Sequence, residues 1–137
     1  MSAPTLYSRL KTVAGPHLRH YITDLTVHDR AICRAMRPGD AAIYAVRDSG
    51  THMATFRNSE DPDQVSAVRT AQFAIDYIDA IVATGSDVHW FLVECTSPQR
   101  GTVSPMTFGK ARLIVLNTRN RLRNGPADLQ ISANIAA

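Results

Sequence analysis

The chain has 137 residues, of which 45% are hydrophobic and 20% charged, and its formal net charge is +3. This length is close to the commonest size of one domain, so we expect a single domain over residues 1–137. No run of about 18 apolar residues occurs, which argues against a membrane span. The first fifteen residues carry Arg9 and Lys11 where a signal peptide is apolar, so a cytoplasmic protein is expected.

The first 25 residues give a poorly defined pattern with one short helical segment. Thr5 to Ala14 fits a helix with Leu6, Leu10 and Val13 on one side, and Gly15-Pro16 breaks it. The remaining residues up to Leu25 have no clean period.

A second helix is predicted to begin after Thr26. Thr26 suits an N-cap, and Asp29 three residues later completes a weak capping box. The residues at helical spacing that should face the core are Ala31, Ile32, Ala35 and Met36. Arg37-Pro38-Gly39 ends the helix, because a proline disfavours helical backbone in the residue before it.

A hairpin is predicted next, with strands at Ala41–Arg47 and Thr51–Phe56. Asp48-Ser49-Gly50 connects them, and a glycine in the last loop position fits a turn that needs a left-handed residue.

The middle of the chain carries a long helical pattern. Asp61 is its expected N-cap, Pro62 its first residue and Gln64 the partner in a capping box. The expected core stripe is Val68, Ala71, Ile75, Ile78 and Val82, and the expected polar side is Arg69, Gln72, Asp76, Asp79 and Ala83. Gly85 suits the end of this helix.

Two more strands are predicted after that helix. Asp87 to Cys95 is apolar on both faces, which is typical of a central strand. Ser97 to Gly101 is a turn, and Thr102 to Met106 is expected to pair back, with Pro105 confining it to the sheet edge.

The last predicted helix is Phe108–Arg123, capped by Thr107, although its start could also lie three residues earlier at Ser104-Pro105. The expected core positions are Ala111, Val115, Thr118 and Leu122. Asn124-Gly125-Pro126 should stop the helix. Residues 126–137 are then expected to form a last strand, at Leu129–Ile135, or a tail.

These elements predict an α+β fold with the order α-ββ-α-ββ-α. The hairpins demand antiparallel pairing, so we expect a small, mostly antiparallel sheet of about four strands, covered by two or three helices.

Charge is distributed unevenly along the chain. Residues 58–94 hold one basic and seven acidic residues, whereas residues 95–127 hold six basic residues and no acidic one. The candidate binding residues are these six: Arg100, Lys110, Arg112, Arg119, Arg121 and Arg123. On the last helix Arg112, Arg119 and Arg123 share a face, and Lys110 and Arg121 are expected on an adjacent stripe. Such a surface is positive wherever it is exposed.

Three alternatives remain for this basic helix. It contacts a partner, either phosphates or a protein; it is an ordinary solvated face favoured by the helix dipole; or it lies against the acidic middle helix of its own chain or of a twin subunit. Coding bias toward arginine would also give the composition.

His52, His89 and Cys95 are secondary candidates for a small catalytic site. A thiol nucleophile needs a base within hydrogen-bond reach. His89 and Cys95 share a strand face but lie roughly 20 Å apart, so only His52 remains as a partner for Cys95. Cys33 and Cys95 are otherwise expected to be buried free thiols. No spacing predicts a metal site, a cofactor or a catalytic set.

The sequence therefore favours a non-enzymatic binding or regulatory protein, of adaptor or inhibitor type, that acts on a protein partner through charged surfaces. A nucleic-acid binder that uses the basic helix is the first alternative, and a small enzyme with a His/Cys site is the second. No membrane partner is expected, and the acidic and basic helices also suit a homo-oligomer.

Overall fold

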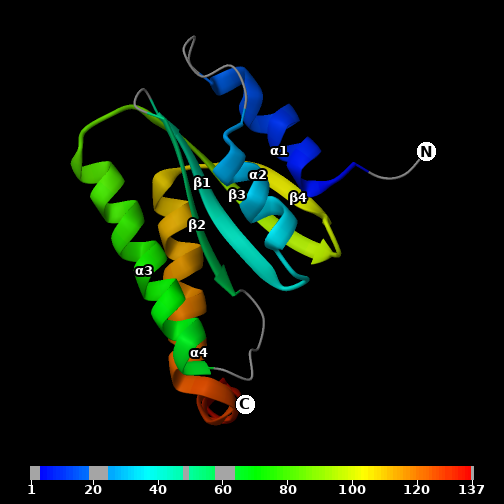
Figure 1. The fold of residues 1–137 in the computed structure, drawn as a ribbon. Coiled ribbons are helices and arrows are strands. Elements are labelled where there is room, and N and C mark those ends of the chain that lie inside the picture. Colours follow the sequence, from blue (N-terminus) through cyan, green and yellow to red (C-terminus); the bar gives the residue numbers. More distant parts are fainter. Residues whose placement is uncertain (1–3, 19–24, 48–49, 58–63, 137) are drawn as a thin grey trace.

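A computed structural model describes residues 4–18, 25–47, 50–57 and 64–136, and gives the backbone alone for residues 125–136. The elements in chain order are α1 (Leu6–Ala14), a 3-10 turn (Gly15–His17), α2 (Val27–Ala35), β1 (Asp40–Arg47), β2 (Gly50–Arg57), α3 (Gln64–Ala83), β3 (Val88–Ser97), β4 (Arg100–Met106) and α4 (Phe108–Ala136) (Figure 1). This order confirms the predicted α+β fold.

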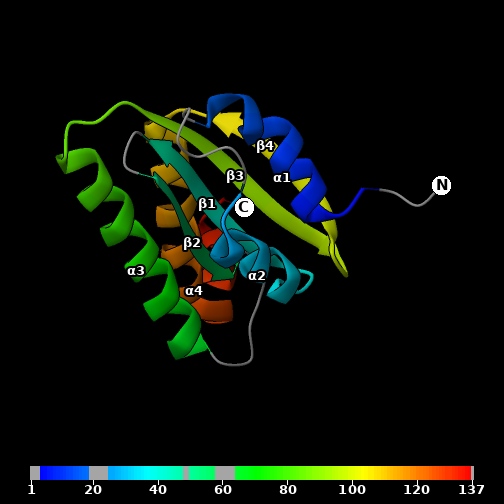
Figure 2. The ribbon, with the colours of Figure 1, turned by 45° about the horizontal axis from the view of Figure 1, so that its top comes forward.

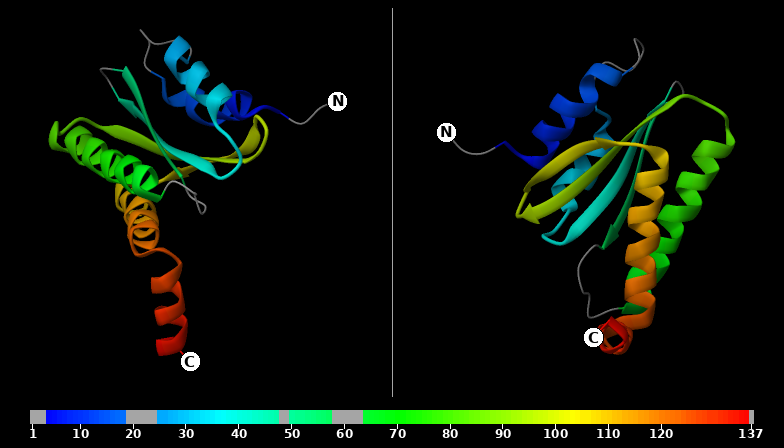
Figure 3. Two further views of the ribbon diagram at one scale, coloured as in Figure 1. Left: turned by 60° about the horizontal axis from the view of Figure 1, so that its bottom comes forward. Right: turned by 180° about the vertical axis from the view of Figure 1, so that it is seen from behind.

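The four strands form one antiparallel sheet in the order β2-β1-β3-β4. Figure 3 (left) shows α1 and α2 on one side of the sheet and α3 and α4 on the other. Four helices cover the sheet instead of the predicted two or three, because α1 also packs on it and buries Leu6, Leu10 and Ala14. A sheet with both faces covered has two cores.

Side-chain alternation along the central strands separates those two cores. In β1, Ala41, Ile43 and Ala45 face α3 and α4, whereas Ala42, Tyr44 and Val46 face α1 and α2. In β3, Trp90 and Leu92 point to the first side and Phe91 and Val93 to the second. The prediction that β3 is a central strand buried on both faces is confirmed, and so is the edge position of β4.

Helix α1 is fixed to the turn between β3 and β4, as Figure 2 shows by the position of α1 across β4. Thr5 caps the helix by accepting a hydrogen bond from the Ser8 N–H at 3.1 Å. The Leu6 N–H then donates to the Gln99 carbonyl at 2.8 Å. Gln99 has a positive φ of 59°, so a residue other than glycine adopts the left-handed conformation in this turn.

Helix α2 begins with the predicted capping box. Thr26 Oγ1 accepts from the Asp29 N–H at 3.1 Å, and Asp29 Oδ2 accepts from the Thr26 N–H at 3.2 Å. Asp29 is nevertheless 1% exposed, and the same oxygen accepts hydrogen bonds from the hydroxyls of Tyr44 at 3.0 Å and Thr51 at 2.8 Å. This carboxylate therefore joins α2 to β1 and β2.

The buried side of α2 agrees with the prediction in part. Of the predicted core residues, Met36 is buried and Ile32 packs against the core, whereas Ala31 and Ala35 are exposed. Asp29 and Cys33, which were not predicted there, are buried. The hydrogen bonds of Asp29 turn the helix so that a carboxylate, and not an alanine, faces the sheet.

Helix α3 packs on the sheet through small residues. Its buried positions are Ala67, Ala71, Ala74, Ile75, Ile78 and Ile81. Val82, predicted to be in the core, is 38% exposed near the end of the helix. The predicted cap at Asp61 and Pro62 lies outside the described residues, as do Asp48 and Ser49 of the predicted hairpin loop. Gly50, predicted as the last loop residue, is instead the first residue of β2 and pairs with Arg47.

Helix α4 has the predicted core positions but not the predicted end. Thr107 caps it by accepting from the Lys110 N–H at 3.2 Å, and Ala111, Val115, Thr118 and Leu122 are buried. The helix runs on through Gly125-Pro126 to Ala136, so residues 126–136 form neither a strand nor a structureless tail. An interior proline bends a helix when the rest continues, and Figure 3 shows the last part of α4 running beyond the sheet. Among the described residues, none of the helices is both long enough and apolar enough to cross a membrane.

Candidate functional site

Two of the six candidate basic residues hold α4 against α3. The Arg112 guanidinium forms two hydrogen bonds with the Asp79 carboxylate, at 2.9 and 3.2 Å. Two turns further along α4, the Arg119 guanidinium donates a hydrogen bond to the side-chain oxygen of Gln72 at 2.6 Å. The alternative in which the basic helix lies against the acidic helix of its own chain is therefore confirmed for these two arginines.

Arg123 lies on the same face of α4 as these two arginines, whereas the other three candidates lie elsewhere. Lys110 and Arg121 lie about half a helical turn away from Arg112, on the side of α4 that faces away from α3, instead of on the adjacent stripe that was predicted. Arg121 is exposed and has an interaction within the chain, and Arg123 is exposed. Arg100 lies on β4, where it donates to the Gln99 carbonyl at 3.4 Å.

His52 belongs to a hydrogen-bonded group on the α3 side of the sheet. Its Nε2 accepts from Arg47 Nε at 2.9 Å, so the proton of the neutral ring is on Nδ1, which is 2.7 Å from the Tyr77 hydroxyl. Arg47 also donates to Thr84 at 3.0 Å. Burial, together with the charge of Arg47, lowers the pKa of His52. The group links β1, β2 and α3 and fixes the Tyr77 ring.

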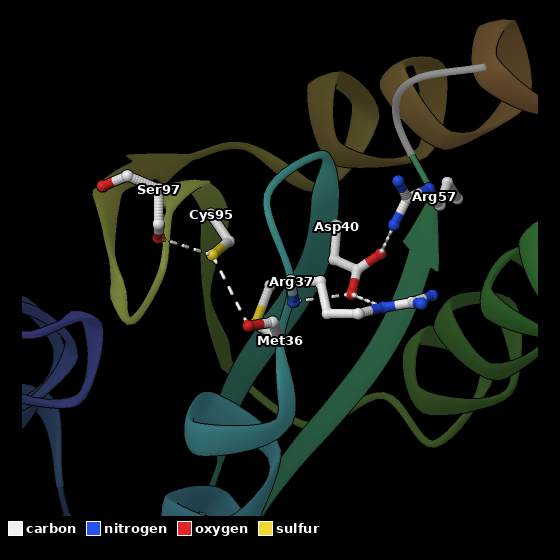
Figure 4. A network of polar contacts seen from close by, with 6 residues as sticks. All are labelled: Met36, Arg37, Asp40, Arg57, Cys95 and Ser97. Atoms are coloured by element: carbon white, nitrogen blue, oxygen red, sulfur yellow. Dashed lines mark hydrogen bonds and ion pairs between the residues drawn. The ribbon is translucent and has the colours of Figure 1, made fainter. Parts of the chain in front are cut away.

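Cys95 and His89 lie on the opposite side of the sheet from His52. The Cys95 thiol contacts the carbonyl oxygens of Met36 at 3.7 Å and Ser97 at 3.2 Å (Figure 4). His89 packs on the His17 ring, with 4.3 Å between centroids. Because the sheet separates His52 from Cys95, the structure does not bring the predicted His/Cys site together.

Both thiols are free and buried, as the sequence predicts. Burial raises the pKa of Cys95, and burial and the nearby charge of Asp29 raise the pKa of Cys33 from 9.0 to about 11. Neither thiol is thereby made a better nucleophile at neutral pH. Within the described part of the chain there is also no group of three His, Cys, Asp or Glu residues placed to hold a metal ion.

The raised Cys33 pKa predicts a loss of stability at alkaline pH. Between pH 9 and 11 the unfolded chain releases the Cys33 proton and the folded chain keeps it, so the free energy of unfolding falls as pH rises, by roughly 2 kcal/mol over this interval. Urea unfolding at several pH values measures the slope. The Cys33→Ala variant should show a shallower fall, and an unchanged slope would contradict the assignment.

A hollow of about 340 Å³ lies at the corner of the sheet where β1 begins and β2 ends. Its walls come from the end of α2, the end of β2 and the beginning of α3. They combine apolar, hydroxyl and charged side chains from Ile32, Ala35, Met36, Arg37, Asp40, Thr55, Phe56, Arg57, Ser66, Ala67 and Thr70.

Asp40 organises the charged side of this hollow, as Figure 4 shows. Its Oδ1 accepts from Arg57 Nη1 at 2.8 Å. Its Oδ2 accepts from the Arg37 N–H at 2.8 Å and lies 3.9 Å from Arg37 Nε. Arg57 and Asp40 are about one-fifth exposed, whereas the Arg37 side chain is 74% exposed. Two guanidinium groups thus lie against one carboxylate.

Comparison with known proteins gave no match. No family model, curated protein or solved structure matched the chain.

This corner was not predicted from the sequence, where Arg37-Pro38-Gly39 was interpreted only as a helix end. The predicted three-residue hairpin loop pairs Arg47 with Thr51, which places Ala41 and not Asp40 opposite Arg57. The observed pairing of Arg47 with Gly50 places Asp40 opposite Arg57. An oppositely charged pair at the open end of a hairpin is a sign of a defined polar contact.

A second feature that the sequence analysis missed is the exposed apolar surface of α3. Val65 is 64% exposed and Phe73 62% exposed, and the Phe73 ring stacks on Tyr77 with 5.9 Å between centroids. The hydrogen bond to His52 orients the Tyr77 ring on which Phe73 stacks. On α4, Leu113 is 53% exposed.

Proposed function

We propose that the chain is a non-enzymatic binding protein of adaptor or inhibitor type, and that it recognises a protein partner through the outer surface of α3. The observation that carries this proposal is the exposure of Phe73 on the immobilised ring of Tyr77. A large aromatic side chain that is already ordered loses little conformational freedom when a partner covers it. Aromatic residues of this kind are enriched at the centres of protein interfaces.

The surroundings of Phe73 support a protein as the partner. Arg69 and Asp76 are both exposed within one helical turn of it, and they supply charges of opposite sign at the rim. Charged groups around an apolar centre favour a correctly oriented partner and disfavour others. In this proposal, the charges that orient the partner are Arg69 and Asp76 on α3. Arg112 and Arg119 contribute less, because they already bind α3.

Nucleic-acid binding through α4 stays a prediction. Of its residues, Arg112 and Arg119 are bound to α3, which leaves Lys110 and Arg123 as the main exposed cations of the set. Phosphate binding requires retention on heparin that weakens steeply with salt. Flow-through at low salt would remove this alternative and leave the α3 proposal unaffected.

A photo-crosslinking amino acid in place of Phe73 tests the proposal in the native host. We expect one defined adduct whose mass exceeds that of the 15.0 kDa chain by the mass of a different protein. Asn117, exposed on the side of α4 away from α3, is the control position and should give no such adduct. Phe73→Ala should weaken partner binding at least tenfold and leave the unfolding midpoint nearly unchanged.

Three results would contradict the proposal. They are no adduct at position 73, equal adducts at positions 73 and 117, and an adduct of twice the chain mass. The last would mean that a second copy covers α3, in line with the homo-oligomer also expected from the sequence.

A further inference from the structure

One histidine of the sheet holds the aromatic surface of α3. Phe73 stacks on Tyr77 with 5.9 Å between ring centroids, and the Tyr77 hydroxyl lies 2.7 Å from His52 Nδ1. The His52 and Tyr77 rings also meet edge-on, with 5.7 Å between their centroids. Among the described residues, His52 supplies the hydrogen bond of the Tyr77 side chain, so the position of Tyr77 depends on the state of the His52 ring.

The contact with Arg47 determines which form of the ring is present. Arg47 Nε carries a hydrogen and can only donate, and it lies 2.9 Å from His52 Nε2. That ring nitrogen must therefore keep its lone pair, and the one proton of the neutral ring is on Nδ1, toward Tyr77. Because a guanidinium does not lose its charge in a protein, this arrangement exists only while His52 is neutral.

Protonation of His52 places two donors opposite each other. An imidazolium carries N–H groups on both ring nitrogens, so Nε2–H and the Arg47 Nε–H would face each other, and both groups would be positive. Arg47 has a second anchor, because its Nη1 donates to Thr84 Oγ1 at 3.0 Å, whereas His52 lies on the edge strand β2. We therefore expect the ring to turn away from Arg47 and, in doing so, to leave Tyr77.

The groups that face His52 favour its neutral form. Arg47 reaches the ring from β1 and Tyr77 reaches it from α3, and the residue opposite His52 on β1 is the uncharged Ala45. The carboxylate of Asp29, from the α2 side of the sheet, favours protonation. Burial and the charge of Arg47 outweigh it, so the pKa of His52 lies below its ordinary value of 6.5. The ring is then neutral at pH 7 and takes up a proton under mildly acidic conditions.

We propose that His52 is a positioning residue of the α3 surface, whose neutral ring holds Tyr77 under Phe73 and whose protonation releases Tyr77 and weakens binding of the protein partner. This inference rests on the proposed function, because it adds control by pH to the same surface. A partner that needs the ordered aromatic pair binds only the molecules with neutral His52. The apparent dissociation constant should therefore rise by up to about tenfold for each pH unit below the His52 pKa.

Nuclear magnetic resonance of the full chain tests the positioning without a partner, between about pH 8 and pH 5, where histidines titrate. At the upper end the His52 ring nitrogens should show the Nδ1–H form. The nuclear Overhauser contacts between the His52 and Tyr77 rings should disappear with the midpoint of the His52 titration. Backbone amide signals that stay dispersed over this range show that the fold is retained.

Arg47→Gln separates the charge of His52 from the release of Tyr77. A glutamine side chain can accept as well as donate a hydrogen bond, so it fits the protonated ring as well as the neutral one. In this variant the pKa of His52 should rise, and the contact between His52 and Tyr77 should persist at about pH 5. His28→Gln is the matched control, because His28 is exposed on α2, on the other side of the sheet, and this variant should lose the contact as the unaltered chain does.

The adduct at position 73 measures the consequence for binding in host extract. Its yield should fall at least about tenfold between the two ends of the pH range, with the midpoint of His52. His28→Gln should show the same fall. His52→Gln cannot titrate at this position, so it should lack the part of the fall that follows His52. Comparison of the two variants removes any pH dependence that comes from the partner, and it decides the question if Arg47→Gln does not fold.

Two kinds of observation would overturn the inference. In the free chain they are contacts between Tyr77 and His52 that persist after His52 is protonated, or the same loss of contact in Arg47→Gln. In the extract it is a pH dependence of the adduct that is equal in His52→Gln and His28→Gln. If the adduct forms at neutral pH despite such results, only the role of His52 falls. Absence of the adduct at every pH removes the proposed function and the control of binding that rests on it.

Discussion

Replacing Asp29 with alanine is expected to lower the free energy of unfolding by about 3 kcal/mol, and the unfolding temperature by about 10 °C. The carboxylate is 1% exposed and one of its oxygens accepts from the Thr26 N–H and from the hydroxyls of Tyr44 and Thr51. Alanine removes the capping box and leaves two hydroxyls with a lost acceptor in the core between α2 and the sheet. Thermal and urea unfolding measure the effect.

Asp29→Asn is the matched control, because its side-chain oxygen can take the place of the carboxylate oxygen that holds all three donors. We expect a loss of about 1 kcal/mol for this variant, clearly smaller than for alanine. Burial and, to a smaller extent, the charge of Asp29 raise the pKa of Tyr44. Because asparagine removes that charge, the phenol of Tyr44 should titrate at lower pH in this variant. Equal losses for alanine and asparagine would show that the hydrogen bonds are not what fixes α2.

Local chemistry made most of the element order predictable. The capping box of Thr26, the cap of Thr107 and the edge position of Pro105 each depend on backbone groups a few residues away, and each prediction is confirmed. The alternation along β3 correctly indicated a central strand because a strand buried on both faces is apolar at every position.

Packing faces were less predictable, because they depend on contacts between distant segments. On α2 the prediction was correct for Ile32 and Met36 but wrong for Ala31 and Ala35, and it missed Asp29. A hydropathy pattern does not place a carboxylate in the core, and the Asp29 partners Tyr44 and Thr51 are 15 and 22 residues away. The end of α4 was wrong for a related reason. Gly125-Pro126 weakens a helix locally, but a proline removes one hydrogen bond and does not by itself end the helix.

The charged contacts of the candidate site were also only partly predictable from the sequence. The arginines of α4 were visible in the sequence. Their partners were not, because the antiparallel packing of α3 on α4 determines that Arg112 binds Asp79 and Arg119 binds Gln72. The acidic helix and the basic helix satisfy each other in part. Phe73 belonged to neither the predicted core stripe nor the predicted polar side of α3, and its exposure follows from which side of the helix meets the sheet.

Replacing Gly101 with alanine is expected to lower the free energy of unfolding by about 2 to 4 kcal/mol. Gly101 lies opposite Cys95 in β4, next to the register shift between Cys95 and Ser97. A Cβ atom added there would overlap the carbonyl group of Glu94 and approach the Cα of Cys95. These are backbone atoms of the neighbouring strand, so the strands must separate locally and the ladder between β3 and β4 weakens.

Gly109→Ala makes the same chemical change at a different position, and we expect it to change the free energy of unfolding in the opposite direction. Gly109 is exposed in the first turn of α4, and an added Cβ meets no atom within 4 Å among the described residues. Alanine there restricts the unfolded chain and favours helix, so the free energy of unfolding should rise by about 0.5 kcal/mol. Urea unfolding of the two variants under one set of conditions compares them directly. If Gly101→Ala were as well tolerated as Gly109→Ala, the close approach of β4 to the Glu94 carbonyl would be contradicted, because no side-chain rearrangement can relieve an overlap with backbone.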